Sequence, residues 1–210
     1  MIEYNIAKEE ELKTCALLSA EAFRDYEYFS VYYPNNKRRY EFIDAVLVCD
    51  IKAKYNDPKI KILTMKESEK IIAVAHLFSP GYKNPTTFEY IKQGALKAMF
   101  IGGIRTTIAW LNMNDSVSAP CHELPGKNRY LGLLTVVKKY QRQGFGSKFL
   151  NDYLIPHVKK EGGETFSLNT NAKKNCKFYE KNGFNLFDER TYTYKGNVLG
   201  NWSYVMNTKE

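Results

Sequence analysis

The sequence predicts a single α/β domain in which a mixed β-sheet is flanked by helices. The length of 210 residues is enough for one such domain with a full core and short for two. Hydrophobic residues at 44% and charged residues at 26% match ordinary globular proteins, which argues against disordered or fibrous structure. Short alternating or continuously apolar segments are interspersed with longer segments whose apolar residues recur at helical spacing.

The first 80 residues predict a strand, two helices and a hairpin. The two helical segments are separated by the aromatic-rich stretch YEYFSVYYPNN, which is expected to be a loop. A polar turn at Glu67–Glu69 separates the two strands of the hairpin. The predicted elements are the strand Ile2–Ala7, the helices Glu9–Phe23 and Lys37–Asn56, and the strands Ile60–Met65 and Lys70–Phe78.

Residues 81–127 predict an insertion of helices, because they combine proline, Gly-Gly and a mixed helical pattern. Asn128–Val137 form a nearly continuous apolar run, which is typical of a central strand covered on both faces. We therefore divide the one domain, 1–210, into an N-terminal part (1–80), the insertion and a C-terminal core (128–210).

The C-terminal core predicts a helix, a strand, a second helix and a last strand. Apolar residues recur at helical spacing from Phe149 to Val158, and Pro156 is expected to bend that helix or restrict its last turn. Gly183 is expected to end the second helix. The remaining predicted elements are the strand Glu164–Thr170, the helix Lys173–Gly183 and the strand Gly200–Met206.

The charge balance favours an anionic partner without choosing one. Lys and Arg number 31 against 23 Asp and Glu, a formal charge of +8. Nucleic acid, a membrane surface or a phosphorylated small molecule would each suit that charge. The densest basic cluster, Lys37–Arg39, is too short for a nucleic-acid-binding arm and fits a solvated helix face.

Cysteine spacing and hydropathy argue against several further classes. The four cysteines show no CxxC pair and no histidine at metal spacing, so neither a metal site nor a disulfide framework is predicted. Reduced thiols in a cytosol fit best. The N-terminus lacks a signal-peptide pattern, and no apolar run approaches the length of a membrane span. We expect a soluble, cytoplasmic protein.

The segment QRQGFG follows the predicted central strand and precedes a predicted helix. Such a turn presents free backbone N–H groups and a positive helix end to an anion. A bulky side chain at Gly144 or Gly146 would stand between the backbone and a pyrophosphate. Gln141, Arg142 and Gln143 would add further backbone donors, and Arg142 a charge.

The alternative is a helix N-terminus that merely contains glycines, which is the ordinary explanation of a lone Gly-x-Gly pattern. No GK[ST] follows, which excludes a Walker A loop. Phe149 occupies the third-glycine position of a dinucleotide-binding GxGxxG motif, which excludes that motif too. What remains is Q-x-x-G-x-G at the end of an apolar strand.

With this motif the chain resembles the GNAT superfamily of acyl-CoA-dependent N-acyltransferases, whose pyrophosphate loop is [QR]-x-x-G-x-[GA]. A second block, LNTNAKKNCKFYEKNGF (168–184), resembles the family's FYEKxGF signature. The segments YYPNNKRR, YLGLLTV and NWSYVM are most similar to the branch that contains puromycin acetyltransferase. Lys138 and Asn169 depart from that branch, where proline and glutamate are common, so the departures put the substrate in doubt and not the cofactor.

The resemblance implies a GNAT-like central sheet, acetyl-CoA as the cofactor, and a binding site around the motif. The backbone of Val136 and Val137 is expected to pair with the pantetheine arm and to offer N–H groups to the thioester carbonyl. The cofactor-binding residues implied are Val136, Val137, Gln141, Arg142, Gln143, Gly144, Phe145, Gly146, Ser147, Asn175 and Tyr179.

Acetyl transfer from a thioester to an amine needs a deprotonated amine, stabilisation of an oxyanion and a proton for the thiolate. Tyr179 occupies the family's general-acid position, and a phenol near pKa 10 can protonate a thiolate whose thiol titrates near 8.5. The alternative is that Tyr179 is simply another aromatic residue of the core. Asn175, one turn earlier, is expected either to bond the pantetheine or to cap locally.

The general base and the acceptor pocket are less defined by the sequence. His122 and Glu123, ahead of the central strand, could relay the amine proton through water, or could simply be a solvated surface pair. Phe29, Tyr32 and Tyr33 are the residues we expect to line the acceptor pocket.

The leading hypothesis is an N-acetyltransferase that moves an acetyl group from acetyl-CoA to a primary amine of a small molecule by direct attack. A noncatalytic acyl-CoA-binding or sensing module is the alternative, and intact Tyr179 argues against it. A basic nucleic-acid-binding domain is a second alternative. The partners expected are a small-molecule amine but no nucleic acid, membrane or metal, and a homodimer is left open.

Overall fold

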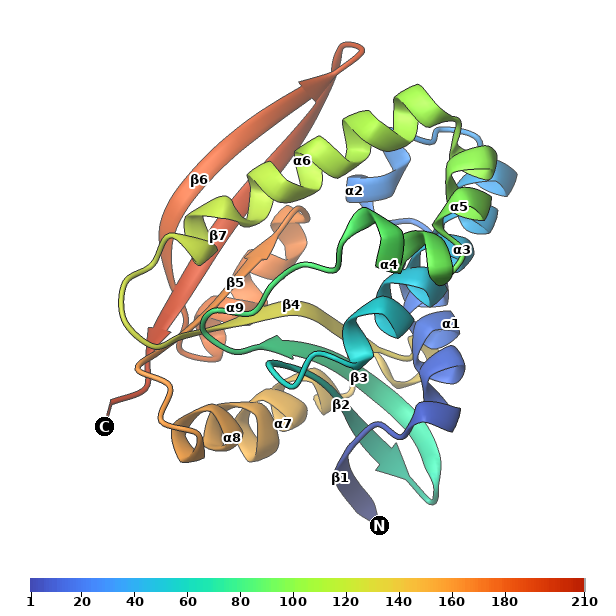
Figure 1. Cartoon of the computed structure of the whole chain (residues 1–210). Coiled ribbons are helices and arrows are strands. Elements are labelled where there is room, and N and C mark those ends of the chain that lie inside the picture. The colour runs from blue at the N-terminus through green and yellow to red at the C-terminus, as the bar shows by residue number, and fades with distance from the viewer. Residues whose placement is uncertain (210) are drawn as a thin grey trace.

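The structure, a computed structural model, describes residues 1–209 and has a seven-stranded mixed sheet at its centre (Figure 1). The order is β1-β2-β3-β4-β5-β7-β6, with β4 and β5 parallel and the other neighbours antiparallel. The strands are β1 (Ile2–Ile6), β2 (Ile60–Glu67), β3 (Lys70–Phe78), β4 (Asn128–Val136), β5 (Thr165–Thr170), β6 (Asn185–Tyr194) and β7 (Asn197–Asn207). The predicted mixed α/β sheet flanked by helices is confirmed.

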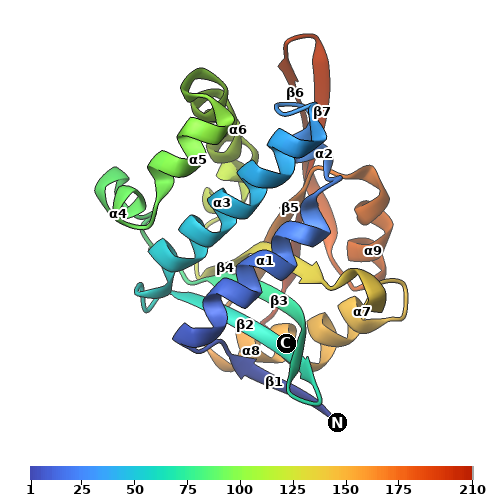
Figure 2. The same cartoon turned by 90° about the vertical axis from the view of Figure 1, so that its right-hand side faces the viewer.

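Helices cover both faces of this sheet. One face carries α1 (Leu12–Phe23), α2 (Glu27–Ser30), α3 (Asn36–Tyr55), α4 (Thr87–Lys92), α5 (Ala95–Gly102) and α6 (Ile104–His122). The other face carries α7 (Phe145–Phe149), α8 (Ile155–Lys160) and α9 (Cys176–Lys181). Figure 2 shows α1 and α3 side by side over the sheet, with α4, α5 and α6 grouped beside them.

Each face has its own core because strand side chains alternate between the two faces. On β3, Ala73, Ala75 and Leu77 belong to the core under α7–α9. Val74 and Phe78 belong to the core under α1 and α3. Both cores join segments that are far apart in sequence, and the first combines Leu63 of β2 and Tyr204 of β7 with residues of α7–α9.

The first 80 residues form the predicted strand, helices and hairpin. The predicted loop differs, because the one-turn helix α2 forms within it. Tyr26 precedes this turn in an extended conformation, and Phe29 anchors it in the core. Beyond β3, the residues expected to form an insertion contain α4, α5 and α6, and α6 runs on to His122.

Strand β6 was not predicted, and β7 begins three residues earlier than expected. The two strands form a hairpin through Lys195 and Gly196, whose φ angles are +48° and +80°. A two-residue turn with both φ angles positive matches the twist of antiparallel strands. The Tyr-Lys-Gly-Asn sequence was the available signal for this hairpin.

The predicted helix after the motif forms with a defect in its middle. A π-helical turn, η3 (Leu150–Leu154), joins α7 to α8 directly before Pro156. Because proline has no N–H to donate to the preceding turn, a widened turn accommodates it. Three short 3₁₀ helices precede α1, the QRQGFG turn and α9, respectively: η1 (Glu9–Glu11), η2 (Lys138–Tyr140) and η4 (Lys173–Asn175).

Helix α6 carries a second proline, Pro120, in its interior. The missing N–H leaves the carbonyl of Ser116 without its helical donor. The hydroxyl of Tyr192 on β6 donates to that oxygen at 2.9 Å. The β6–β7 hairpin is thereby attached to α6, along which it lies in Figure 1.

Candidate active site

The central sheet opens between β4 and β5, and a bulge at Gly132 accompanies the opening. The β3–β4 register skips Gly132, and β4 pairs with β5 only from Asn128 to Leu131. A Cβ on Gly132 would lie 2.5 Å from a ring carbon of Phe78. Gly132 is exposed although it belongs to the central strand. The second half of β4 therefore presents an unpaired edge to a gap, as bulges often do beside active sites.

Consecutive backbone amides at the end of β4 have no partner within the protein. Among residues 1–209, no backbone or side-chain acceptor is bonded to the amides of 142–147. The chain turns here through Arg142 and Gly144, with φ of +61° and +84°, before α7 begins. Free amides at a helix start attract an anion with several oxygens.

The two glutamines brace this turn. Gln141 donates through Nε2 to the carbonyl of Val136 at 2.9 Å, and Gln143 donates to the carbonyl of Lys139 at 2.6 Å. The backbone N–H of Gln141 is bonded to the carbonyl of Lys138. The expectation that this N–H is a free donor is therefore wrong, and the role the structure gives Gln141 is to hold the turn.

The two motif glycines have different reasons for being glycine. A Cβ on Gly144 would meet nothing within 4 Å, but the positive φ strains any other residue there. A Cβ on Gly146 would lie 3.2 Å from the Phe178 ring. Gly144 thus faces open space as expected of a phosphate cradle, whereas Gly146 allows α7 to approach α9.

Of the two valines, only Val136 can offer its amide to a ligand in the gap. The N–H of Val137 donates to the carbonyl of Ile72 on β3 at 2.9 Å, so the expectation that it contacts the thioester is corrected. Because neighbouring residues of a strand direct their N–H groups to opposite sides, Val136 faces the opening toward β5.

The other predicted cofactor residues of α7 are held by Asn182, at the end of α9, and by Tyr140 of η2. Asn182 donates to the Ser147 hydroxyl at 3.1 Å and accepts from Asn151 at 2.8 Å. The Phe145 ring packs edge-on against Tyr140, with centroids 5.5 Å apart. These contacts fix where the helix begins relative to the gap.

Tyr179 lies on α9, which follows the open end of β5, and is 8% exposed. Among residues 1–209, none is hydrogen-bonded to its hydroxyl. Burial and the neighbouring Tyr26 raise the pKa of Tyr179, so the phenol stays protonated at neutral pH. An unpaired, protonated hydroxyl is what a proton donor to a ligand requires.

Asn175 makes a local contact, one of its two expected roles. Its side-chain amide donates to the Thr170 hydroxyl at 3.1 Å, at the end of β5. The Tyr26 hydroxyl lies 3.1 Å from the same Thr170 oxygen and accepts from the amide of Asn171 at 2.8 Å. Tyr26 thereby ties the segment before α2 to the open end of β5.

The three aromatic residues predicted to contact the acceptor are buried in the core. Phe29 stacks on Trp110, Tyr32 on Tyr194, and Tyr33 packs against Phe42. Their rings join α2 and the segment that follows it to α6, to the β6–β7 hairpin and to α3. A direct contact with substrate stays a prediction, and the role the structure gives them is packing.

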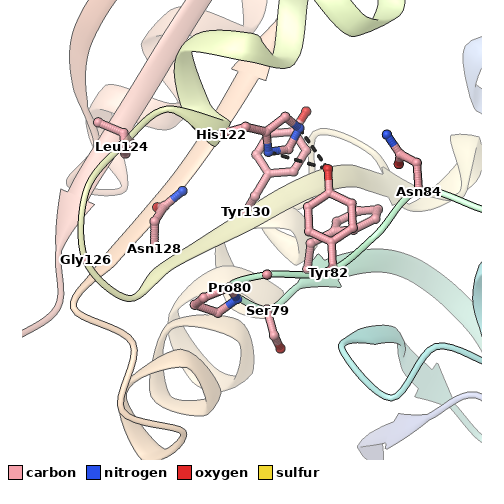
Figure 3. Close-up of a pocket in the computed structure, with 11 residues that line it drawn as sticks. Ser79, Pro80, Tyr82, Asn84, His122, Leu124, Gly126, Asn128 and Tyr130 are labelled. Atoms are coloured by element: carbon pink, nitrogen blue, oxygen red, sulfur yellow. Dashed lines mark hydrogen bonds between the residues drawn. The ribbon is translucent and has the colours of Figure 1, made fainter.

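His122 lies in a pocket at the other end of β4 (Figure 3). Its Nε2 is 2.9 Å from the Tyr82 hydroxyl, and its ring meets Tyr130 edge-on at 4.5 Å. The Tyr130 hydroxyl donates to Asn169 at 2.6 Å, directly beyond the point where β4 and β5 separate. Burial and the charge of Lys54 lower the pKa of His122, which favours the neutral imidazole.

The structure does not bring His122 and the motif together directly. Tyr130 and Val136 are six residues apart on β4, roughly 20 Å at the rise of a strand. Glu123 caps the end of α6 through its backbone, and its side chain is exposed. No cluster of three or more potential metal ligands occurs within residues 1–209.

Comparison with known proteins identifies the family. A model described as the acetyltransferase (GNAT) domain matches residues 79–197, more than half of the chain. The chain belongs to the GNAT acetyltransferase family. A search of curated proteins gave no match for this acetyltransferase.

Solved structures agree with this acetyltransferase in fold. A Corynebacterium glutamicum structure is named "histone acetyltransferase HPA2 and related acetyltransferase". It has a TM-score of 0.66 at 17% identity, and the alignment covers 96% of this chain and 94% of that chain. The PaiA N-acetyltransferase of Thermoplasma acidophilum, in complex with coenzyme A, has a TM-score of 0.58 at 14% identity, with 99% of each chain covered. An N-acetyltransferase of Staphylococcus aureus has a TM-score of 0.58 at 15% identity, covering 100% of this chain and 99% of its own.

Two residues that position parts of the acetyltransferase site were not predicted. Tyr26 was assigned to a loop, and its contact with Thr170 spans 144 residues of sequence. Asn182 was part of the signature block but carried no predicted role. An unusual density of tyrosines was the only sequence signal for Tyr26, and it does not distinguish one ring from another.

No helix within 1–209 combines the length and apolar character needed to cross a bilayer.

Proposed function

We propose that this GNAT acetyltransferase transfers an acetyl group from acetyl-CoA to a primary amine of a small molecule by direct attack. The observation that carries the proposal is the run of free amides at 142–147, directly after the unpaired end of β4. A pyrophosphate has several anionic oxygens that could accept hydrogen bonds from these free amides. The CoA complex of the Thermoplasma relative supports the cofactor.

The residues of the gap match the needs of the reaction. The acetyl group would be supplied as a thioester, with a C–N bond forming as the C–S bond breaks. The N–H of Val136 would stabilise negative charge on the carbonyl oxygen. Tyr179 would donate its proton to the departing thiolate, and its raised pKa keeps it in the acid form.

His122 is the better candidate for the general base. The side chains of His122 and Glu123 are both exposed. His122, however, contacts Tyr82 and Tyr130, and Tyr130 is bonded to Asn169 at the point where β4 and β5 separate. The amine proton would pass through water to the neutral imidazole. Because the pKa of His122 is lowered, kcat/KM should fall only below the ordinary histidine range, and His122→Gln should flatten that limb of the pH profile.

The branch of the family, the cellular location and the kinds of partner are also part of this proposal. The puromycin-acetyltransferase-like branch, a cytoplasmic location, and the absence of nucleic-acid and membrane partners rest on sequence alone. The noncatalytic acyl-CoA-binding module remains the alternative function. The free hydroxyl of Tyr179 favours the enzyme, because a binding module needs no proton donor at the thioester.

The deciding experiment is a panel of primary amines assayed for release of the CoA thiol from acetyl-CoA. Monoamines, diamines, amino acids, peptides and aminonucleosides would together cover the acceptor classes. Turnover of one class supports the enzyme and names its substrate. Tight acetyl-CoA binding by calorimetry, with no turnover across the panel, would support the noncatalytic module instead.

A further inference from the structure

A row of four tyrosines leads from the open end of β5 to the pocket of Figure 3. The Tyr26 hydroxyl contacts Thr170 at the end of β5, and the Tyr26 ring lies 6.2 Å from that of Tyr28, measured between centroids. Tyr82 and Tyr130 line the pocket. Burial raises the pKa of Tyr130, and the phenols of the other three raise it further, so all four lie close together. We call these four residues the tyrosine row.

Two carboxylates from different helices lie beside the tyrosine row, Asp50 on α3 and Asp115 on α6. Burial raises the pKa of Tyr82, and the charges of Asp115 and Asp50 raise it further. Burial also raises the pKa of Tyr28, and the same two carboxylates add to that shift. Like charges around partly buried rings reinforce one another. The tyrosine row therefore lies in a negative potential.

Within residues 1–209, the two carboxylates have a single ion-pair partner. Asp50 pairs with Lys54 at 2.8 Å and accepts from the Tyr90 hydroxyl at 3.0 Å. Asp115 has no ion-pair partner in that part of the chain, and the Asn114 side chain donates to it across a long 3.4 Å. One negative charge beside the row is thus left unmatched.

A buried imidazole near Asp50 also lacks a partner. His76 is 4% exposed, and the alternation of β3 places it on the same face as Val74 and Phe78, toward α3. Its Nε2 has no hydrogen-bond partner among residues 1–209. Burial lowers the pKa of His76 to about 4, and the charges of Asp50 and Lys54 both act on it. With its proton on Nδ1, this neutral ring offers Nε2 as an acceptor, which calls for a donor from outside the chain.

An ammonium ion fits these features together. It carries a positive charge and several N–H donors but no acceptor. Carboxylate oxygens, phenol oxygens and the imidazole nitrogen can all accept its hydrogen bonds, and tyrosine rings attract a cation to their faces. An anionic group would be repelled by the carboxylates, and an apolar group would leave these acceptors unpaired.

We propose that the acetyl acceptor is a linear amine with a second positive charge, and that Asp115, Asp50 and the tyrosine row bind its far ammonium group. We call this place the cation site. The inference rests on the acetyl transfer proposed above. The reacting amine would lie at the Tyr26 end of the row, because Tyr26 is also the phenol that, after burial, raises the pKa of Tyr179. Its proton would reach His122 through water along the row.

Kinetics with straight-chain diamines and monoamines of equal carbon number tests the cation site. The wild-type protein should favour the diamine in kcat/KM by about tenfold or more, because its far end gains charge-assisted bonds. Asp115→Asn should lower that preference about tenfold and leave monoamine turnover unchanged, since Asp115 supplies the unmatched charge. Glu10→Gln is the matched control. It removes an equal charge from an exposed site before α1, at the opposite end of that helix from Tyr26, and should leave the preference intact.

Charge reversal and direct binding separate the cation site from acetyl transfer. Asp115→Lys should make the diamine the poorer substrate of the two. Calorimetry with a diamine, with and without coenzyme A, measures the site without any reaction, and Asp115→Lys should raise the Kd at least about tenfold. If no amine turned over but diamine binding still followed this pattern, acetyl transfer would be wrong and the cation site would stand. A diamine preference or diamine Kd unchanged in Asp115→Lys would overturn the cation site. So would a wild-type protein that turns over and binds both amines equally.

Discussion

The two faces of the sheet are built in different ways. On the α7–α9 face, the turn, the free amides and Tyr179 come from one stretch of about forty residues, 141–179, and the core beneath them is apolar. On the α1–α6 face, tyrosines and asparagines from distant segments form a polar layer. There Asn169 donates to Asn201, and Asn201 donates to the carbonyl of Val117 on α6.

This difference separates two tasks. The compact α7–α9 face is suited to a ligand of fixed chemistry, because local backbone geometry alone forms the anion cradle. The α1–α6 face depends on side chains whose positions are set by tertiary contacts. Acceptor specificity should therefore change with substitutions on the α1–α6 face, and cofactor affinity with substitutions in the turn.

The largest expected effect is on the cofactor face. Gly144→Val should reduce acetyl-CoA affinity about a thousandfold or more, because its branches crowd amides whose charge-assisted bonds are worth about 1.5–3 kcal/mol each. Calorimetry on the folded variant measures the loss. Gly162→Val is the matched control, since Gly162 also has a positive φ of +69° with open space around it. The Gly162→Val variant should carry similar backbone strain and bind acetyl-CoA normally. Equal acetyl-CoA affinity in both variants would contradict the proposal that the amides around Gly144 bind the pyrophosphate.

The local origin of the turn and of α9 explains why the sequence predicted where these elements lie. The Q-x-x-G-x-G motif and the FYEKxGF block placed Gly144 and Tyr179 because motif residues act through neighbouring backbone. The same reasoning was wrong for Val137, whose N–H is used by Ile72. Sheet pairing decides that contact, and a single segment does not contain it.

The α1–α6 face was predicted much less well, for a related reason. Phe29, Tyr32 and Tyr33 were assigned to an acceptor pocket from composition, but each ring finds a distant aromatic partner in the core. Strand β6 was missed because its alternating pattern is largely exposed and its pairing comes from β7. Pairings between distant segments carry little local signal.

The second prediction concerns the α1–α6 face in acid. Buried His76 has its pKa lowered to about 4 by desolvation. The unfolded chain binds a proton near pH 6.5 and the folded protein does not, so stability is lost as the pH falls from about 6.5 to 4, by about 3 kcal/mol. His76→Leu should remove this part of the pH dependence while leaving stability at pH 8 similar. Urea unfolding at several pH values measures the free energy of unfolding. If that free energy depended on pH equally in the variant and the wild type, the role of His76 in acid would be ruled out.

The third prediction concerns Tyr179 on the α7–α9 face. Tyr179→Phe keeps the ring and deletes the proposed proton donor, so kcat with a working amine should fall about a hundredfold. The affinity for acetyl-CoA should change little, because one hydroxyl contributes only about 0.5–1.5 kcal/mol. Steady-state kinetics and calorimetry on the same preparation separate the two quantities. An unchanged kcat would make Tyr179 a packing residue.

The smallest expected effect concerns how the β6–β7 hairpin is attached to the α1–α6 face. Tyr192→Phe deletes the donor to the Ser116 carbonyl and should lower the free energy of unfolding by about 0.5–1.5 kcal/mol. Tyr194→Phe is the matched control, because the Tyr194 ring stacks on Tyr32 and that stacking survives the loss of the hydroxyl. Urea unfolding of both variants gives the comparison.

A double-mutant cycle with Pro120→Ala sharpens this last test. Alanine at position 120 restores the helical N–H to the Ser116 carbonyl, so the Tyr192 hydroxyl should then matter less. The cavity left by removing the proline ring appears in both Pro120→Ala variants and cancels from the cycle. A coupling energy of about 0.5 kcal/mol or more would show that the hairpin repairs the helix defect. Additive changes would mean that water satisfies the carbonyl equally well, and that the attachment of the hairpin rests on its aromatic contacts alone.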